Sequence, residues 1–232
     1  MAIKKSLLKK SSDDRIKIKI SKNGPYIIYG GIPLEESIII RDEEGISTQW
    51  RAGKKYPIRD KYELCRCGQS KNQPFCDGAH LHIQFDGTET AGNETYLKQV
   101  KEINGPELEL TDKPNLCVHA GFCDRAGGIW KLIKKSRDAK SKNIAIQEAS
   151  DCPSGRLVVW DKEGNEIEPK FEPSIVLIED PQEGVRGPLW IRGSIPIESD
   201  DGIIYEIRNR VTLCRCGKSS NKPFCDGAHL NK

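Results

Sequence analysis

Short apolar runs separated by glycine and proline make up most of the pattern along this chain. Isoleucines alternate with lysines over residues 16–20, and a period of two is typical of a strand with one buried face. Clusters of Gly and Pro between the runs indicate turns. The other runs that we expect to form strands are residues 37–41, 107–110, 156–160, 175–178 and 203–207.

Only one segment, residues 126–136, has helical character, and this begins after Gly127 and Gly128. No low-complexity linker divides the chain, so we expect one compact body. The pattern therefore predicts an α+β fold, mainly short β-strands with irregular loops and short helices.

Two segments of eighteen residues, 64–81 and 213–230, agree at fifteen positions. The repeat extends upstream, because the Gly-Pro and Ile-Pro pairs of residues 24–33 return in residues 187–196. The first copy carries an insert, since Gly24 and Cys65 are 41 residues apart, whereas Gly187 and Cys214 are 27 apart. We expect three regions, namely repeat 1 in residues 1–85, a different region in residues 86–169 and repeat 2 in residues 170–232.

Composition narrows the possible partners. Hydrophobic residues make up 36% of the chain, charged residues 31%, and the net charge of +3 is too small to indicate a nucleic-acid partner. The basic group Lys4, Lys5, Lys9 and Lys10 is interpreted as a solvated tail, with a surface-docking arm as the alternative. No apolar run is long enough for a membrane span, and a cytoplasmic protein is expected.

Nine cysteines point to metal chemistry. Their odd number argues against a complete disulfide framework, and a reducing cytosol leaves thiols free to bind metals. They fall into three triplets: Cys65, Cys67 and Cys76; Cys117, Cys123 and Cys152; Cys214, Cys216 and Cys225. The distribution predicts three metal centres.

Each eighteen-residue segment presents three cysteines and one histidine as C-x-C-x8-C-x3-H, a complete set of four metal ligands. Structural zinc sites usually place two to four residues between paired cysteines. Here a single residue stands between the first two. A cluster of two irons instead divides its four ligands between the two metals. Zinc remains an alternative to such a cluster.

The ending Pro-x-Cys-Asp-Gly-Ala-His resembles the CDGSH iron–sulfur family, with Ala79 and Ala228 where the name-giving motif has serine. In that family three cysteines and a histidine bind one [2Fe–2S] cluster, and the unit usually pairs with a second one in a homodimer. The resemblance implies that the two copies pair inside this chain with pseudo-twofold symmetry, which makes a monomer sufficient, and a further homodimer is the alternative. The ligands that it implies are Cys65, Cys67, Cys76 and His80 for one cluster, and Cys214, Cys216, Cys225 and His229 for the other.

The histidines affect the chemistry that we expect. A neutral imidazole in place of a thiolate makes a cluster easier to reduce, and protons compete with iron for the ring. We therefore expect pH-dependent potentials and acid-labile clusters. Asp77 and Asp226 are expected to cap a helix that carries the histidine, and a tuning role for these carboxylates is the alternative.

The middle triplet follows another pattern. Cys117, Cys123 and the later Cys152 occupy three of the four positions of a bacterial ferredoxin, while Ala120 stands at the remaining one. Three thiolates are typical of a [3Fe–4S] cluster. The segment also resembles the divergent single-cluster ferredoxin domain, a [4Fe–4S] binder, in which case His119 or a non-protein ligand would complete the cluster. A middle region without a cluster is the third possibility.

These centres predict an iron–sulfur electron-transfer protein rather than an enzyme, because the chain shows no nucleophile–base set, phosphate loop or nucleotide fingerprint. Its partners would be redox proteins. The second hypothesis is a cluster-transfer or redox- and pH-sensing protein, whose partners would be apo-acceptor proteins. The third is a zinc-stabilised interaction module.

Overall fold

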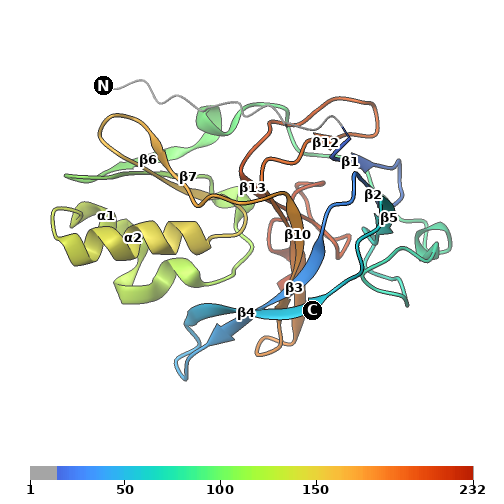
Figure 1. Ribbon diagram of the computed structural model, residues 1–232, viewed down its shortest axis with the longest axis horizontal. Helices are drawn as coiled ribbons and strands as arrows, with labels where there is room; N and C mark the ends of the chain where they lie inside the picture. Colours follow the sequence, from blue (N-terminus) through green and yellow to red (C-terminus); the bar gives the residue numbers. More distant parts are fainter. Residues whose placement is uncertain (1–14, 232) are drawn as a thin grey trace.

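The computed structural model describes residues 15–231 (Figure 1). The lysine group at Lys4, Lys5, Lys9 and Lys10 lies outside the described residues. Three sheets account for the strands of the described part, as the α+β prediction requires, and this prediction is confirmed. Sheet A has the order β12 (Ile197–Glu198), β1 (Lys17–Ile20), β2 (Tyr26–Tyr29) and β5 (Lys61–Leu64). Sheet B has the order β13 (Arg210–Leu213), β11 (Val185–Arg192), β10 (Ser174–Asp180), β3 (Leu34–Arg41) and β4 (Ser47–Lys55). Sheet C has the order β6 (Lys101–Asn104), β7 (Glu109–Asp112), β8 (Leu157–Trp160) and β9 (Glu166–Ile167).

The two repeats exchange one strand each. β12 of repeat 2 pairs in parallel with β1, opposing Ile197 to Ile18, and β3 of repeat 1 pairs in parallel with β10, opposing Leu34 to Ile175. Sheet A (β12-β1-β2-β5) and the β3-β10-β11-β13 part of sheet B are therefore the same arrangement with the repeats interchanged. This topology agrees with the expected internal pairing of the two repeats.

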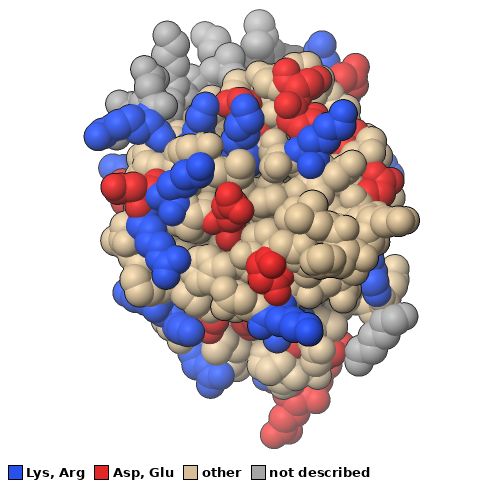
Figure 2. Space-filling view, turned by 90° about the vertical axis from the view of Figure 1, so that its right-hand side faces the viewer, with Lys and Arg blue, Asp and Glu red and all other residues tan. Residues whose placement is uncertain are grey.

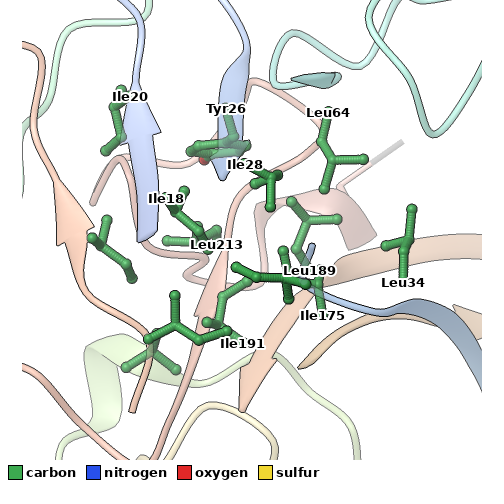
Figure 3. Close-up of a cluster of buried hydrophobic side chains, with 14 of the residues drawn as sticks. Ile18, Ile20, Tyr26, Ile28, Leu34, Leu64, Ile175, Leu189, Ile191 and Leu213 are labelled. Atoms are coloured by element: carbon green, nitrogen blue, oxygen red, sulfur yellow. The ribbon is translucent and has the colours of Figure 1, made fainter. Parts of the chain in front are cut away.

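A shared apolar core joins these two sheets. Figure 3 shows Ile18 and Ile28 of sheet A near Leu189 and Ile191 of sheet B, and all four are almost fully buried. Burying an isoleucine or leucine contributes roughly 1.5–3 kcal/mol to folding. The side chains of the two repeats thus stabilise one β body.

The region between the repeats forms sheet C with two helices on it, on the left in Figure 1. α1 (Ile129–Lys134) and α2 (Ala139–Asp151) pack against Leu110 and Val159 of the sheet. α1 corresponds to the expected helical segment, whereas α2 was not predicted. Asp138 begins α2, because its carboxylate accepts a hydrogen bond of 2.8 Å from the amide of Ser141.

The structure differs from the expected strands at residues 203–207 and in the insert of the first repeat. The prediction of a strand over residues 203–207 is wrong, because Ile204 makes only an isolated bridge with Glu198. Ile203 and Ile204 are about half exposed, and the run is held beside β12 by hydrogen bonds from the amide of Ser199 to Ile203 O and from the amide of Tyr205 to Ile197 O, without forming a continuous strand. The insert of the first repeat forms β4, which pairs with β3 as a hairpin. No helix in the described part is long and apolar enough to span a membrane.

Candidate metal centres

Each outer cysteine loop starts at the end of a strand. β5 leads into Cys65 and β13 into Cys214. An isolated bridge closes each loop, with the amide of Cys65 donating to Pro74 O at 2.8 Å and that of Cys214 to Pro223 O at 2.9 Å. This closure brings the third cysteine of the motif beside the first.

The four candidate ligands of each outer site stand as two pairs. The thiols of Cys65 and Cys67 are 3.8 Å apart, and the thiol of Cys76 is 3.5 Å from Nδ1 of His80. A tetrahedral metal with bonds of about 2.3 Å to sulfur and about 2.0 Å to nitrogen separates two thiolates by about 3.8 Å, and a thiolate from an imidazole by about 3.5 Å. Each pair thus has the spacing for one metal.

The second repeat has the same geometry. Cys214 and Cys216 are 3.6 Å apart at sulfur, and the thiol of Cys225 is 3.5 Å from Nδ1 of His229. Among residues 15–231, no group of three or more His, Cys, Asp and Glu side chains is arranged to hold one metal ion. Donors gathered as two pairs fit a cluster of two irons, which takes two protein ligands on each iron.

The expected helix at the histidine is present only as a single turn of 3-10 helix, Ala79–Leu81 and Ala228–Leu230, and its N-cap is Gly78 or Gly227 instead of the aspartate. Asp77 instead connects the two ends of its loop, accepting from the amides of Lys71 at 2.8 Å and Ala79 at 3.0 Å. These amide hydrogen bonds lower the pKa of Asp77. Asp226 makes the equivalent bonds to Ser220 and Ala228.

The arginine between the first two cysteines of each motif has a structural role that the sequence analysis did not predict. Arg66 and Arg215 are almost fully buried and donate to backbone carbonyls, Arg66 to Ser21 at 3.2 Å and Arg215 to Gly187 at 2.5 Å. Both arginines therefore fix the Cys-Arg-Cys turn to the strand loops beside it. The signal was available, because an arginine stands at this position in both copies.

The third cysteine of the motif differs in burial between the two outer sites. Cys225 is buried and Cys76 is only partly so, whereas at the second cysteine the order is reversed, with Cys67 buried and Cys216 partly buried. Burial raises the pKa of the Cys225 thiol. Burial, with the charge of Arg215 next, lowers the pKa of His229 to about 4. A thiol that resists ionisation needs a metal cation to become a thiolate, and the neutral imidazole is the metal-binding form.

The middle triplet converges on one cavity. Cys117 follows the turn Pro114–Leu116, Cys123 lies in the turn Phe122–Gly127, and Cys152 caps the C-terminus of α2. All three line a cavity of about 380 Å³. Burial raises the pKa of Cys123 to about 12, so a thiolate there again requires a metal.

Charged side chains and the β3–β4 hairpin lie at this cavity. Arg41 and Arg156 line it, each paired with a carboxylate, that of Asp180 at 2.6 Å and that of Asp112 at 2.7 Å. On the hairpin, the Ser47 hydroxyl donates to Ala120 O at 2.6 Å. The insert of the first repeat therefore positions the loop that carries Cys117 and Cys123.

His119 lies at two cavities, one in the middle site and one beside the second outer site. It lines the cavity of the three cysteines, and it also lines a second, narrow cavity together with His229. Its backbone has φ 56°, a left-handed conformation uncommon for a residue with a side chain. His82, a histidine of the first repeat that lies outside the motif, is exposed.

Comparison with protein families matches both repeats and the region between them. Residues 23–81 and 186–230 match the family described as iron-binding zinc finger CDGSH type. The chain therefore carries two CDGSH-type iron-binding regions. Its middle region, residues 103–162, matches the divergent 4Fe-4S mono-cluster family, so two CDGSH regions flank a ferredoxin-like one. No curated protein matches the chain.

Proposed function

We propose that this protein transfers electrons through two Cys3His [2Fe–2S] clusters and one three-cysteine cluster, [3Fe–4S] or [4Fe–4S]. The proposed ligands are Cys65, Cys67, Cys76 and His80; Cys214, Cys216, Cys225 and His229; and Cys117, Cys123 and Cys152, with His119 as a candidate fourth ligand of a [4Fe–4S] form. Iron–sulfur clusters supply one-electron chemistry. The chain supplies thiolates, neutral imidazoles and buried surroundings.

One observation carries this proposal, namely that the three candidate sites are contiguous. A methyl group at Gly227, beside Cys225, would lie 3.0 Å from Cys117 O, so the middle and second sites are in backbone contact. A methyl group at Gly68 would lie 2.8 Å from Cys216 O, so the two outer sites are in contact as well. Three adjacent one-electron centres suit a relay between redox partner proteins in the cytoplasm.

A cluster-transfer function is the second candidate, and the exposure of the first site favours it. Cys76 is only partly buried, and Leu81, which follows its histidine, is 74% exposed. One experiment separates the two functions. The holoprotein is reduced anaerobically by dithionite, separated from the excess reductant by gel filtration, and mixed with ferricytochrome c or with an apo-ferredoxin. Iron is then assayed in each protein. Electron transfer predicts cytochrome reduction with all iron kept by this chain, whereas iron in the ferredoxin and an unreduced cytochrome would overturn it.

Replacing either motif histidine tests the ligand assignment. We expect His80→Cys and His229→Cys each to lower the potential of one cluster by roughly 100 mV, because a thiolate adds negative charge to the site. Loss of the imidazole also removes a slope of up to about 59 mV per pH unit, since reduction no longer takes up a proton at the ring. Potentiometric titrations between pH 6 and pH 9 measure both effects. His82→Cys is the control, and a pH slope that persists at the substituted cluster in both motif variants would contradict the assignment.

A further inference from the structure

The second CDGSH site lies between the other two sites. We infer that Gly227 and His119 form the contact that couples the ferredoxin-like site to the second CDGSH site, and that the first site is coupled only to the second. This inference rests on the proposed function and adds the order of the centres to it. That order is ferredoxin-like, second CDGSH, first CDGSH.

The contact at Gly227 distinguishes the two repeats. A methyl group on Gly227 would lie 2.5 Å from Cδ2 and 3.0 Å from Nε2 of His119. At Gly78, the equivalent position of the first repeat, a methyl group would meet nothing within 4 Å. The two glycines have nearly the same backbone, with φ 87° and φ 85°. Of these two motif glycines, only Gly227 therefore contacts the ferredoxin-like loop, which repeat 1 meets through Ser47 of its β3–β4 hairpin.

The two outer sites meet through a reciprocal contact. A methyl group on Gly68 would lie 2.8 Å from Cys216 O, and one on Gly217 would lie 2.9 Å from Cys67 O. Each loop thus places a glycine against the backbone of a ligand residue in the other. Glycine is required on both sides, because any side chain would push the loops apart.

The first site forms the open end of this series. Leu81 is 74% exposed, whereas its equivalent Leu230 lines the cavity of the middle triplet. Figure 2 looks onto the side where β2 and β5 lie in Figure 1, and uncharged residues form a broad area there with charges of both signs around it. A redox partner can therefore approach the first site directly.

The position of His119 assigns it to this contact instead of to the missing corner of the middle cluster. The Cδ2–Nε2 edge of its ring lies on Gly227, and its side chain lines a cavity shared with His229. Its backbone is left-handed, with φ 56°. We therefore assign His119 as a positioning residue between the two sites.

Each transfer between neighbouring centres would move one electron. A one-electron reductant of the flavodoxin or ferredoxin class would reduce the ferredoxin-like centre, and oxidation of that centre would reduce the second CDGSH centre by one electron. The first centre would receive the same electron, and a one-electron acceptor protein would remove it. Imidazole ligation raises the potential of the outer centres, which makes this direction favourable.

Spin–spin broadening in the electron paramagnetic resonance spectrum of the reduced holoprotein tests the order. With Cys76→Ala, which removes the first cluster, we expect the remaining [2Fe–2S] signal to stay broadened by the middle centre. With Cys225→Ala, which removes the second, we expect a sharp [2Fe–2S] signal. The reverse pattern, or equal broadening in both variants, would overturn the inference.

Subtler variants test the contact with all three clusters present. We expect Gly227→Ala to weaken the part of the broadening that the middle centre causes, leaving the mutual broadening of the two outer centres, and Gly78→Ala to change neither part, although both place alanine at the same positive φ. We expect the His119→Ala protein to keep all of its iron and to lose part of the broadening of the [2Fe–2S] signal. Loss of iron would make His119 a ligand and overturn its assignment as a positioning residue. Iron and acid-labile sulfide are measured on every sample. A wild-type chain without the middle cluster contradicts the proposed function itself, whereas full clusters with unchanged broadening in Gly227→Ala contradict only the relay order.

Discussion

Replacing Arg210 with methionine is expected to lower the free energy of unfolding by about 3–5 kcal/mol, the cost of breaking a buried ion pair. Arg210 lies on β13 and is 2% exposed. Its guanidinium pairs with Glu168 at 2.5 Å and donates to the carbonyls of Ala149 and Cys152, both at 2.5 Å. The substitution leaves the carboxylate and these carbonyls buried without their partner.

The same side chain connects repeat 2 to the ferredoxin-like region, because Cys152 is a candidate ligand of the middle cluster. We therefore expect Arg210→Met to weaken iron binding at that site as well. Guanidinium denaturation of the anaerobic holoprotein, followed by circular dichroism, measures the stability. Arg192→Met is the matched control, since Arg192 pairs with Glu35 at 2.6 Å in a more exposed setting, where such pairs contribute about 0–1 kcal/mol. Equal losses in the two variants would contradict the role given to Arg210.

We expect low pH to remove the contribution of the Arg210–Glu168 pair to the free energy of unfolding. Burial alone would raise the pKa of Glu168, but pairing with Arg210 keeps this pKa below its ordinary value. A carboxylate with a lowered pKa stabilises the fold above its unfolded pKa, and this contribution is lost as the pH falls through the folded value. The stability difference between wild type and Arg210→Met should therefore shrink as the pH falls below about 4.

Replacing Cys152 with alanine is expected to remove the whole middle cluster and leave both [2Fe–2S] clusters in place. The cavity holds three thiols, and a cubane-type cluster that keeps only two protein thiolates loses much of its binding free energy. About three of about seven irons per chain should be lost, or four of eight for a [4Fe–4S] form. Iron analysis and electron paramagnetic resonance measure the change.

The control for this experiment is Ser154→Ala, which alters the hydroxyl that lies 3.6 Å from the Cys152 thiol while keeping every candidate ligand. It should retain all iron. Loss of the two [2Fe–2S] signals in Cys152→Ala, with the third signal unchanged, would contradict the assignment of Cys152 to the middle centre.

Local sequence signals were enough to predict which residues come together at the outer sites. The spacing of Cys65, Cys67, Cys76 and His80 depends on one loop closed by a strand pairing, so the residues that meet are close along the chain. The same holds for the strand of residues 16–20, which alternates as a half-buried strand should. Repetition of the whole unit also made internal pairing predictable.

Long-range packing explains what the sequence could not predict. The run of residues 203–207 has strand composition, but only Ile204 finds a bridge partner, because β-propensity reflects the available neighbours. α2 carries few large apolar residues, and its capping residue Asp138 was its main signal. The contact of His119 with Gly227 joins residues from different regions, and no pattern in either segment indicates it.

The central claim, three iron–sulfur centres in one chain, is tested most directly by counting iron and acid-labile sulfide in anaerobically purified protein, together with electron paramagnetic resonance. Two [2Fe–2S] clusters and one [3Fe–4S] cluster predict about seven irons per chain, and a [4Fe–4S] cluster in the middle predicts about eight. A protein with about four irons, or with zinc in place of iron, would contradict it.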